Sequence, residues 1–539
     1  MKKIESLFIG ISLFSVLAIA GVFLYNSVSV TGQGGISYKV PETKYGSFLA
    51  AQHAIYSNDF DNAVRFTASL SDVEYPVVYN ARILADFLSG KMPSDVSVLK
   101  EDKGISARFI YDAHLVQNKQ WSEFHARHKK DMSVLTAPLR IWSAIANDWR
   151  TNTFKYIDGL STNESWKSFV RGQIYAQLGN ADEAAKHFAM VTSDFMNIND
   201  YLYIMSFYRH HGKTELAELL YNNFTSRPAG MFLSDYENIP DWSLFSGYEN
   251  SLAFSLIQTV SHTQVLMYSD MAVLMLRFAQ IIAPELAQTN NVVDYYLGQY
   301  FFNKSGDGMR FFERIEQTSP FYLFASLRTF EKTGDITLLK RALSQRPLFV
   351  PAINKLVGHY IRIGDRSAAL AVIRRALSSD VLDEAGRAFF IKSRAQIHYA
   401  FGDFDAAQSD IRTASDILLP DAEIVALQAK IWAAQNREIE NAYKYAMTLV
   451  TQNPADILAW DTLGVVVAVR EGVDAALDLL SRVGEVSVTH SELFMHIGDM
   501  YAVKGDVDKA RAAYIRAIDL SDDGLIVVPE IEKKLRKLK

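Results

Sequence analysis

The stretch SELFMHIGDMYAVKGDVDKARAAYIRAIDL, residues 491–520, decides the fold of this 539-residue chain. Apolar residues recur in it at helical spacing on both sides of a Gly-Asp turn that begins at Gly505. This spacing predicts two amphipathic helices, and the Gly supplies the left-handed residue at which the first helix ends. The stretch therefore predicts a helical hairpin.

The spacing of small and bulky residues in this hairpin recurs along the chain. A Gly is followed by an Ala after five residues, by a bulky residue four later, and by an apolar residue three after that. The five sets are Gly179–Ala184–Phe188–Val191, Gly212–Ala217–Tyr221–Phe224, Gly364–Ala369–Ile373–Ala376, Gly402–Ala407–Ile411–Ala414 and Gly505–Ala510–Tyr514–Ala517. Such self-similarity indicates a solenoid, in which each unit buries its apolar face against its neighbours.

The spacing of prolines supports the same repeat length independently of the glycines. A Pro follows an apolar helix-end residue by five positions at Pro284, Pro320, Pro347 and Pro454, because Pro cannot continue a helix. The prolines at 284 and 320 are 36 residues apart, and Gly472 precedes Gly505 by 33. Both markers indicate a repeat of about 34 residues.

The unit 491–520 resembles the tetratricopeptide repeat (TPR). The residues at the consensus places are Phe494, Ile497, Gly498, Tyr501, Ala510, Tyr514 and Ala517, and Trp460, Leu463 and Gly464 open another unit in the same way. The resemblance is strong over 351–520 and good over 165–225. It implies an all-α, right-handed superhelix of helical hairpins, in one or two segments. Small residues are needed where the two helices of a hairpin cross closely.

Composition limits the function classes. Hydrophobic residues make up 49% of the chain and charged residues 22%, which suits a folded protein with a large core. The formal charge of −6 offers no basic footprint, so no nucleic-acid partner is expected. The chain has no Cys, which excludes disulfides, thiolate metal sites and Cys nucleophiles.

The N-terminus predicts a membrane anchor. After a cytoplasmic segment 1–6, which contains Lys2 and Lys3, residues 7–26 carry no charge and are long enough to span a bilayer. The positive-inside rule then places the rest of the chain across the membrane. The alternatives are a signal peptide cleaved after Ala18-Ile19-Ala20 and, less consistent with the length, a buried core helix.

The remaining chain is divided by its local composition. We expect a flexible linker over 27–44, N-terminal TPR-like repeats over 45–227, an irregular junction over 228–303, a C-terminal array over 304–520 and a capping helix over 521–539. Asn58 takes the Gly position in an early repeat, because Asn tolerates the left-handed conformation. A basic amphipathic membrane helix is the alternative for the tail.

The junction 228–303 departs from the repeat pattern. Its beginning is irregular and rich in aromatic residues, and two long apolar helices are expected near Ser251–Ser261 and Tyr268–Ile282. It is interpreted as the boundary between two superhelices. The alternative is a mutated repeat whose long loop packs on the solenoid.

No catalytic, cofactor or metal site is predicted. The chain has neither a phosphate-binding Gly loop nor a G-x-S-x-G elbow. His125 and His128 share a helix face, but two ligands do not close a metal site, so a solvated polar face is expected there. His210 and His211 are expected at a helix end, where a cation complements the helix dipole.

Polar residues on the first helix of each repeat are the candidate binding residues. By resemblance to TPR folds, these residues line the concave groove: Gln173, Gln177, Ser206, Arg209, Asn354, Arg362, Lys392, Gln396, Asp461, Glu492 and Asp499. Lys392 with Gln396 resembles part of a carboxylate clamp, but the following unit lacks the Lys or Arg that would complete it. For each residue the alternative is a merely solvated helix face.

The sequence thus predicts a non-enzymatic scaffold that binds peptide or helical segments of protein partners. The anchor and the array together resemble N-terminally anchored, alphaproteobacterial cell-envelope TPR proteins. This resemblance implies an inner-membrane, single-pass protein with a periplasmic solenoid and envelope-assembly partners, or a protein secreted to the periplasm after cleavage. The rival hypothesis is an envelope-remodelling or peptidoglycan-associated factor with a site in 228–303, which a deep polar pocket there with convergent carboxylates or His262 would favour.

Overall fold

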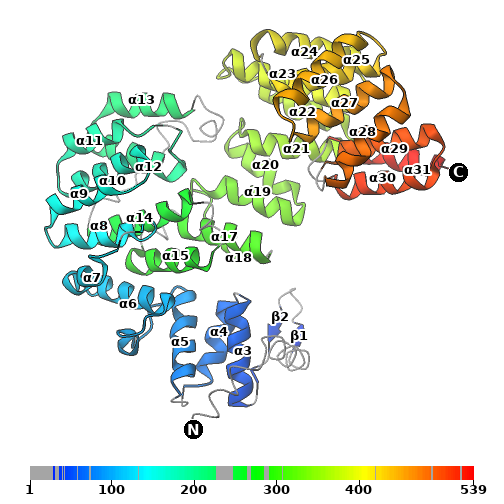
Figure 1. The fold of residues 1–539 in the computed structure, drawn as a ribbon. Helices are drawn as coiled ribbons and strands as arrows, with labels where there is room; N and C mark the ends of the chain where they lie inside the picture. The colour runs from blue at the N-terminus through cyan, green and yellow to red at the C-terminus, as the bar shows by residue number, and fades with distance from the viewer. Residues whose placement is uncertain are drawn as a thin grey trace. The chain divides into compact units, whose positions relative to one another are not determined.

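The structure is a computed structural model of the full chain, and almost all of its ordered segments are helices (Figure 1). It describes residues 28–30, 36–38, 40–41, 43–57, 59–71, 75–131, 133–192, 194–225, 247–263, 269–284, 291–305, 308–418, 421–486, 490–521 and 525–538. The chain forms two compact units, Met1–Thr329 and Phe330–Lys539. The prediction of an all-helical repeat architecture is confirmed for the described residues from 43 onward.

The first unit contains a hairpin of short strands followed by helices. Its elements are β1 (Val28–Val30), β2 (Ile36–Tyr38), α3 (Lys44–Tyr56), α4 (Phe60–Ala68), α5 (Pro76–Leu88), the 3-10 turn η1 (Ser97–Leu99), α6 (Ile105–Gln117), α7 (Trp121–His128), α8 (Ala137–Ala146), α9 (Arg150–Gly159), α10 (Glu164–Gln177), α11 (Ala181–Ala189), α12 (Ile198–His210), α13 (Thr214–Thr225), α14 (Tyr248–His262), α15 (Asp270–Ile282), α17 (Val292–Ser305), α18 (Met309–Phe312) and α19 (Tyr322–Thr333), which runs into the second unit.

The second unit continues in pairs of helices. These are α20 (Ile336–Gln345), α21 (Val350–Arg362), α22 (Arg366–Leu377), α23 (Glu384–Ala400), α24 (Phe404–Leu418), α25 (Ala422–Ala434), α26 (Ile439–Gln452), α27 (Ile457–Arg470), α28 (Val473–Val486), α29 (Ser491–Lys504), α30 (Val507–Asp519) and α31 (Val528–Lys537).

Two short strands lie within the predicted flexible linker 27–44. β1 and β2 pair antiparallel, with Val28 opposite Tyr38 and Val30 opposite Ile36. The β-branched residues of both strands suit a paired, extended backbone. The predicted anchor 7–26 lies outside the described residues. Among the residues that are described, no helix is long and apolar enough to cross a membrane.

The predicted Gly turns are confirmed. Gly179, Gly212, Gly364, Gly402 and Gly505 all have φ between 62° and 84°, the left-handed conformation that Gly adopts without steric cost. An Asp often starts the next helix, because its side chain accepts a hydrogen bond from an otherwise unpaired backbone N–H. Asp506, for example, caps α30 by accepting from the N–H of Lys509.

Close helix crossings hold the hairpins together. A Cβ added to Gly498 would lie 2.5 Å from Cδ1 of Tyr514, and one added to Gly464 would lie 2.4 Å from the Leu480 side chain. Gly172 stands in the same relation to Phe188. The partner follows the Gly by sixteen residues in each case, so one residue pair fixes how the two helices of a hairpin meet.

The two long helices of the predicted junction belong to the core of the first unit. They form as α14 and α15, close to the predicted positions, and Leu252, Phe254, Met275 and Phe278 are all buried in one cluster with α6, α8, α10 and α12. The compact units divide after Thr329 and not within 228–303. The aromatic-rich beginning of the junction, 226–246, lies outside the described residues.

Helix α31 covers the end of the second unit. Its Ile531 is buried in a cluster with Ala510, Tyr514 and Ala517 of α30, and Leu535 packs against the same cluster. Its remaining positions are mainly charged and face solvent, which is the pattern of a cap on the last repeat.

We expect Gly498→Ala to destabilise the second unit by about 1 to 3 kcal/mol, because the new methyl group would overlap the Tyr514 ring. Chemical denaturation of the full chain, followed by circular dichroism, measures this change. Gly358→Ala is the matched control, since Gly358 lies within α21 with nothing within 4 Å of an added Cβ. Ala favours a helix over Gly by about 0.8 to 1 kcal/mol, so the control should be neutral or stabilised. Equal stability of the two variants would contradict the crossing argument.

Candidate functional site

In the first unit, helix α14 lies against the inner helices α8, α10 and α12 (Figure 1). Ser251 of α14 donates a hydrogen bond to Oε1 of Gln177 at 3.2 Å, and Ser255 donates to Oε1 of Gln173 at 3.3 Å. Gln173 is fully buried. The expectation that Gln173 and Gln177 face an open groove is therefore corrected: a helix of the same chain occupies that position.

Further polar contacts extend along the same face of α14. Gln258 donates from Nε2 to Asp200 at 2.7 Å, and His262 Nε2 lies 2.5 Å from the other oxygen of that carboxylate. The Trp142 indole of α8 donates to Ser255 at 2.8 Å. Buried polar groups need such partners, because an unpaired one costs about 1 to 3 kcal/mol. The contacts therefore fix the position of α14 along the groove.

The other candidates on α12 divide into one buried and one exposed residue. Ser206 is buried, whereas Arg209 is exposed in the last turn of the helix. His210 ends α12 and His211 is its C-cap, so the predicted placement of both at a helix end is confirmed.

In the second unit, ion pairs join the first helices of successive repeats. Lys392 of α23 binds Asp421, the N-cap of α25, at 2.9 Å. Lys430 of α25 binds Asp461 of α27 at 2.5 Å. We call these contacts, together with those that follow, the inner ion-pair series.

The series continues to the end of the chain. Asp461 also binds His496 of α29, with Oδ1 and Nδ1 2.7 Å apart. Asp499 of α29 binds Lys534 of the capping helix α31 at 2.6 Å and accepts from the Tyr514 hydroxyl at 2.7 Å. Lys392 and Asp461 are buried and join neighbouring repeats, which corrects their assignment as groove residues open to a ligand, whereas Asp499 joins α29 to α31 and keeps exposed surface.

Asp461 is the most strongly perturbed member of the series. It is fully buried, which by itself would raise the pKa of the carboxyl, but His496 and Lys430 outweigh this and hold the pKa well below its usual range. A carboxyl with a depressed pKa stabilises the fold above its unfolded pKa near 4. This stabilisation is lost as the pH falls below that value.

A second set of contacts joins the turns of successive repeats. A residue near the end of one first helix binds an acidic residue in the first turn of the preceding second helix. The pairs are Lys213 with Asp182, Gln435 with Asp405, Arg470 with Glu440, and Lys504 with Asp474. They are largely exposed, so each adds little on its own.

The remaining candidates of the second unit are more open. Asn354 is exposed, while Arg362 and Gln396 are half-buried. Glu492 is half-buried and accepts a hydrogen bond from the backbone N–H of Leu525 at 3.1 Å, so it anchors the segment before α31. In the second unit, the predicted residues therefore include some that join the repeats and a more exposed group, Asn354, Arg362 and Gln396.

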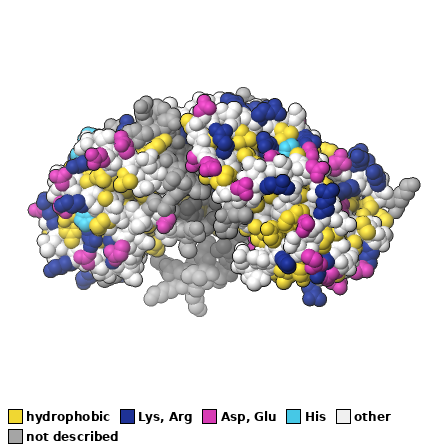
Figure 2. Space-filling model, turned by 90° about the horizontal axis from the view of Figure 1, so that it is seen from above, with side chains coloured by type: hydrophobic (Ala, Val, Ile, Leu, Met, Phe, Trp, Pro, Cys, Tyr) yellow, Lys and Arg dark blue, Asp and Glu magenta, His cyan; other side chains and the backbone are white. Residues whose placement is uncertain are grey.

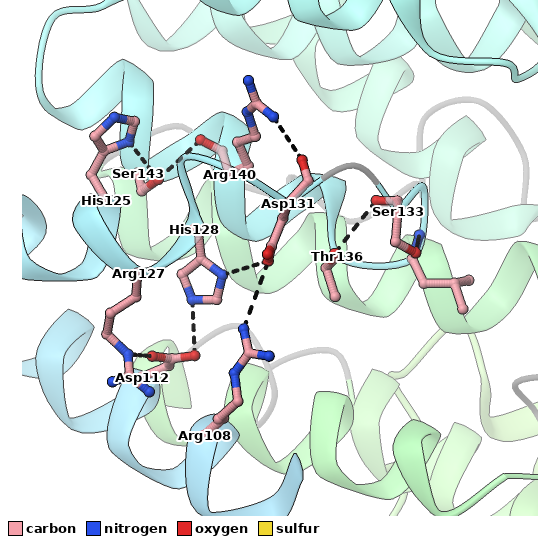
Figure 3. Close-up of polar contacts among 11 residues, drawn as sticks. Arg108, Asp112, His125, Arg127, His128, Asp131, Ser133, Thr136, Arg140 and Ser143 are labelled. Atoms are coloured by element: carbon pink, nitrogen blue, oxygen red, sulfur yellow. Dashed lines mark hydrogen bonds and ion pairs between the residues drawn. The ribbon is translucent and has the colours of Figure 1, made fainter. Parts of the chain in front are cut away.

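His125 and His128 are buried, which corrects the expectation of a solvated face (Figure 3). His128 lies between two carboxylates, with Nε2 2.9 Å from Asp112 and Nδ1 2.8 Å from Asp131. Burial alone would lower the pKa of His128, but the two carboxylates outweigh it and raise the pKa. His128 therefore links α7 to α6 through a charged network.

His262, the candidate of the rival hypothesis, lies at the edge of a cavity of about 420 Å³. The cavity is lined by Val134, Leu135, Thr162, Asn163, Trp166, Thr192, Asp194, Phe195, Thr259, His262 and Thr263. The imidazole stacks on Phe195 with centroids 4.3 Å apart, and its Nε2 contacts the buried Asp200. His262 thus positions α14 on α12, and Asp194 is the one carboxylate among the described lining residues.

Charged side chains are intermixed on the face drawn in Figure 2. Lys and Arg alternate there with Asp and Glu over both described parts of the chain, in keeping with the small formal charge of −6. This face therefore presents many local charges and not one broad field of a single sign.

These features define a helical-repeat protein in which Gly crossings recur within hairpins and ion pairs join successive first helices. Residues 491–523 match the family model of the tetratricopeptide repeat. No curated protein matches the chain.

Three solved structures have weak overall similarity to the chain. A tetratricopeptide repeat protein from Parabacteroides merdae is 11% identical and covers 54% of this chain and 98% of its own. The Cut9-Hcn1 hetero-tetramer of the APC/C is 12% identical, with 92% and 96% covered, and yeast Tom70 is 13% identical, with 92% and 95% covered. All three have TM-scores of 0.32, and no function follows from similarity at this level.

We expect Lys430→Met to destabilise the second unit by about 3 kcal/mol, because it leaves the buried carboxylate of Asp461 without its ammonium partner. Urea denaturation at pH 7 measures the loss. Lys504→Met is the matched control, since it breaks an exposed pair with Asp474 and should leave the midpoint close to that of the unmodified chain. If both variants unfolded at the same urea concentration, the inner ion-pair series would have no special role.

Proposed function

We propose that this chain is a non-enzymatic scaffold whose helical repeats bind helical or peptide segments of partner proteins. The observation that carries the proposal is α14, which lies on the inner helices of the first unit through hydrogen bonds to Gln173, Gln177 and Asp200. The repeats can therefore receive a helix in a defined register. Tetratricopeptide repeat proteins generally act as protein-interaction scaffolds, and residues 491–523 match that repeat.

The open part of the second unit is the proposed site for a partner. Asn354 and Arg362 lie on α21 and Gln396 lies on α23, and all three retain exposed surface. An amide, a guanidinium and a second amide offer hydrogen-bond donors and acceptors for a peptide backbone or a polar helix face. We name these three residues the open polar set.

The location of the scaffold is proposed from the sequence of its N-terminus. The uncharged segment 7–26 would anchor the chain in the inner membrane, and Lys2 and Lys3 would hold the first residues in the cytoplasm. The repeats would then lie in the periplasm and bind partners in envelope assembly. Cleavage of the segment, which would release the same repeats into the periplasm, is the alternative.

The structure favours the scaffold function over the envelope-remodelling hypothesis. A polar cavity does adjoin His262, as that hypothesis requires, but its imidazole Nε2 contacts Asp200 and stacks on Phe195. These contacts give His262 a positioning role for α14. No substrate, cofactor or metal is proposed for that cavity.

The open polar set should crosslink to partner proteins. We expect p-benzoylphenylalanine at position 354, 362 or 396 to give discrete crosslinked species in growing cells upon irradiation. Arg375 of α22 and Arg412 of α24 are exposed positions on second helices and provide matched controls, and both match the charge lost at Arg362. Immunoblotting against the chain, followed by mass spectrometry of the products, measures the outcome.

Two results would count against the scaffold proposal. One is the absence of crosslinks at all three positions while the protein is present at normal levels. The other is an identical set of products from the control positions, since this would indicate encounter by diffusion and not a defined groove.

Export of the repeats is tested separately. We expect alkaline phosphatase fused after Lys539 to be active and β-galactosidase fused there to be inactive, because phosphatase folds only where disulfides form. Fractionation of the same cells distinguishes an anchor from a cleaved signal, since only the anchored chain remains with the membranes. An active β-galactosidase fusion would overturn the proposed topology without affecting the binding proposal.

A further inference from the structure

We propose that an open cavity between α7, α8 and α9 binds a dianionic phosphate group. The cavity has a volume of about 480 Å³ and is separate from the polar cavity beside His262. It is lined by His125, Lys129, Arg140, Ala144, Trp149, Asn152, Thr153, Lys155, Tyr156, Gly159 and Leu160. The site is independent of the scaffold function proposed above.

Three lining residues are cations, and none of the described lining residues is Asp or Glu. Lys129 follows α7, Arg140 lies on α8 and Lys155 lies on α9, so each wall contributes one positive charge. Like charges at one site repel, and the repulsion is relieved when an anion enters. Three cations favour a ligand with two negative charges over a single carboxylate.

Two buried polar atoms at this cavity lack a hydrogen-bond partner among the described residues. They are Nε2 of His125 and the hydroxyl of Tyr156, and both side chains are at least nine-tenths buried. A buried polar atom without a partner costs about 1 to 3 kcal/mol, so such atoms in a native fold require an explanation. A bound oxyanion would provide the missing acceptor for both.

The hydrogen bonds around His125 set which nitrogen faces the ligand (Figure 3). Ser143 donates its hydroxyl proton to the backbone oxygen of Arg140 at 3.0 Å, so its oxygen accepts from Nδ1 of His125 at 3.1 Å. Nε2 is then left as the atom that gains a proton. A protonated Nε2 donates to an oxyanion, which an unprotonated one cannot do.

Two contacts orient the guanidinium of Arg140 at the cavity. Its Nη1 donates to the backbone oxygen of Asp131 at 2.7 Å, and its guanidinium lies 3.9 Å from the centroid of the Tyr156 ring. The more exposed Lys129 and Lys155 form no ion pair with a described residue. The guanidinium of Arg140 is therefore held in one position, whereas the two exposed lysine side chains can adjust to a ligand.

Binding at this site should be linked to the protonation of His125. Burial and the charges of Arg140, Lys129 and His128 lower the pKa of His125, so the imidazole is neutral near pH 7 when the cavity is empty of anions. Lys155 and Tyr156 of α9 line the same cavity, the centroid of the Trp149 ring lies 4.8 Å from that of His125, and the carboxylate of Asp131 acts on both Arg140 and Tyr156. A dianion would raise the pKa of His125, and binding would therefore strengthen as the pH falls.

Trp149 provides a probe at the edge of the cavity. The full chain labelled with 5-fluorotryptophan contains seven tryptophans, and the fluorine resonance of Trp149 is identified by its loss in Trp149→Phe. Inorganic phosphate, sulfate, phenyl phosphate and acetate are titrated separately at constant ionic strength, which is maintained with chloride. We expect a saturable shift of this resonance with phosphate and sulfate, and weak or no binding of acetate.

Lysine variants distinguish binding in the cavity from nonspecific attraction of anions to a positively charged surface. Lys129→Gln combined with Lys155→Gln should weaken phosphate binding about fivefold or more, because both charges line the cavity. Lys103→Gln combined with Lys130→Gln removes the same charge from exposed positions outside the cavity and should change the affinity less than about twofold. Equal effects of the two double variants would overturn the proposal.

Sulfate tests the proton linkage, because its own charge is constant between pH 5.5 and 7.5. We expect sulfate affinity to rise as the pH is lowered over this range in the unmodified chain, and to lose that dependence in His125→Gln. A folded His125→Gln chain with unchanged pH dependence would contradict the assignment of Nε2 as the proton acceptor. The lysine variants test the site even where this buried substitution prevents folding.

The remaining outcomes identify the ligand or reject it. Tighter binding of phenyl phosphate than of inorganic phosphate assigns the site to a phosphomonoester that uses the Trp149 and Leu160 surface. Equal binding of the two assigns it to free phosphate. The absence of a saturable shift with every anion, or acetate binding as tightly as phosphate, would overturn the proposal.

Discussion

The close crossing of two helices within a hairpin is the constraint on which the repeats depend. At Gly498 the backbone of α29 leaves no room for a Cβ beside Tyr514, and Gly464 meets Leu480 in the same way. Because such a crossing fixes the angle and depth of its hairpin, the first helices α27 and α29 are presented to their neighbours in the same way. The regular ion pairs between those helices follow from this geometry.

The polar residues of the inner ion-pair series join successive repeats and do not form an open binding surface. Lys430, Asp461 and His496 come from three successive repeats, and Asp461 has no solvent exposure. A buried charge is tolerated only where its partners are fixed, because desolvation is costly. The polarity of this surface thus specifies the register in which repeats stack, and the open polar set lies towards the start of the unit.

Local spacing made the hairpins predictable, whereas contacts between distant residues did not. Gly402 and Gly505 adopt the left-handed conformation that their position between helical patterns predicts. Gly298 was missed as a crossing residue although an added Cβ would lie 2.4 Å from the Phe312 ring, because this partner follows after fourteen residues and not sixteen. A search that allowed a shorter hairpin could have found it.

The contacts of the candidate site residues also could not be predicted from local sequence spacing. His128 was expected on a solvated face, since its partner Asp112 lies on the preceding helix and nothing in the local pattern connects the two. Gln173 lies 82 residues before Ser255, and their contact depends on where α14 packs. The cation-lined cavity combines Lys129, Arg140 and Lys155 from three walls, so its charge is visible only once the helices are in place.

Helix α14 competes with any external helix for the surface of the first unit on which it lies. A segment tethered to its receptor acts at an effective concentration in the millimolar range, far above that of most free proteins. An external helix that seeks the surface around Gln173 and Asp200 must first displace Ser255 and Gln258 of α14. An external helix therefore binds this surface only if its affinity is high enough to displace the tethered α14.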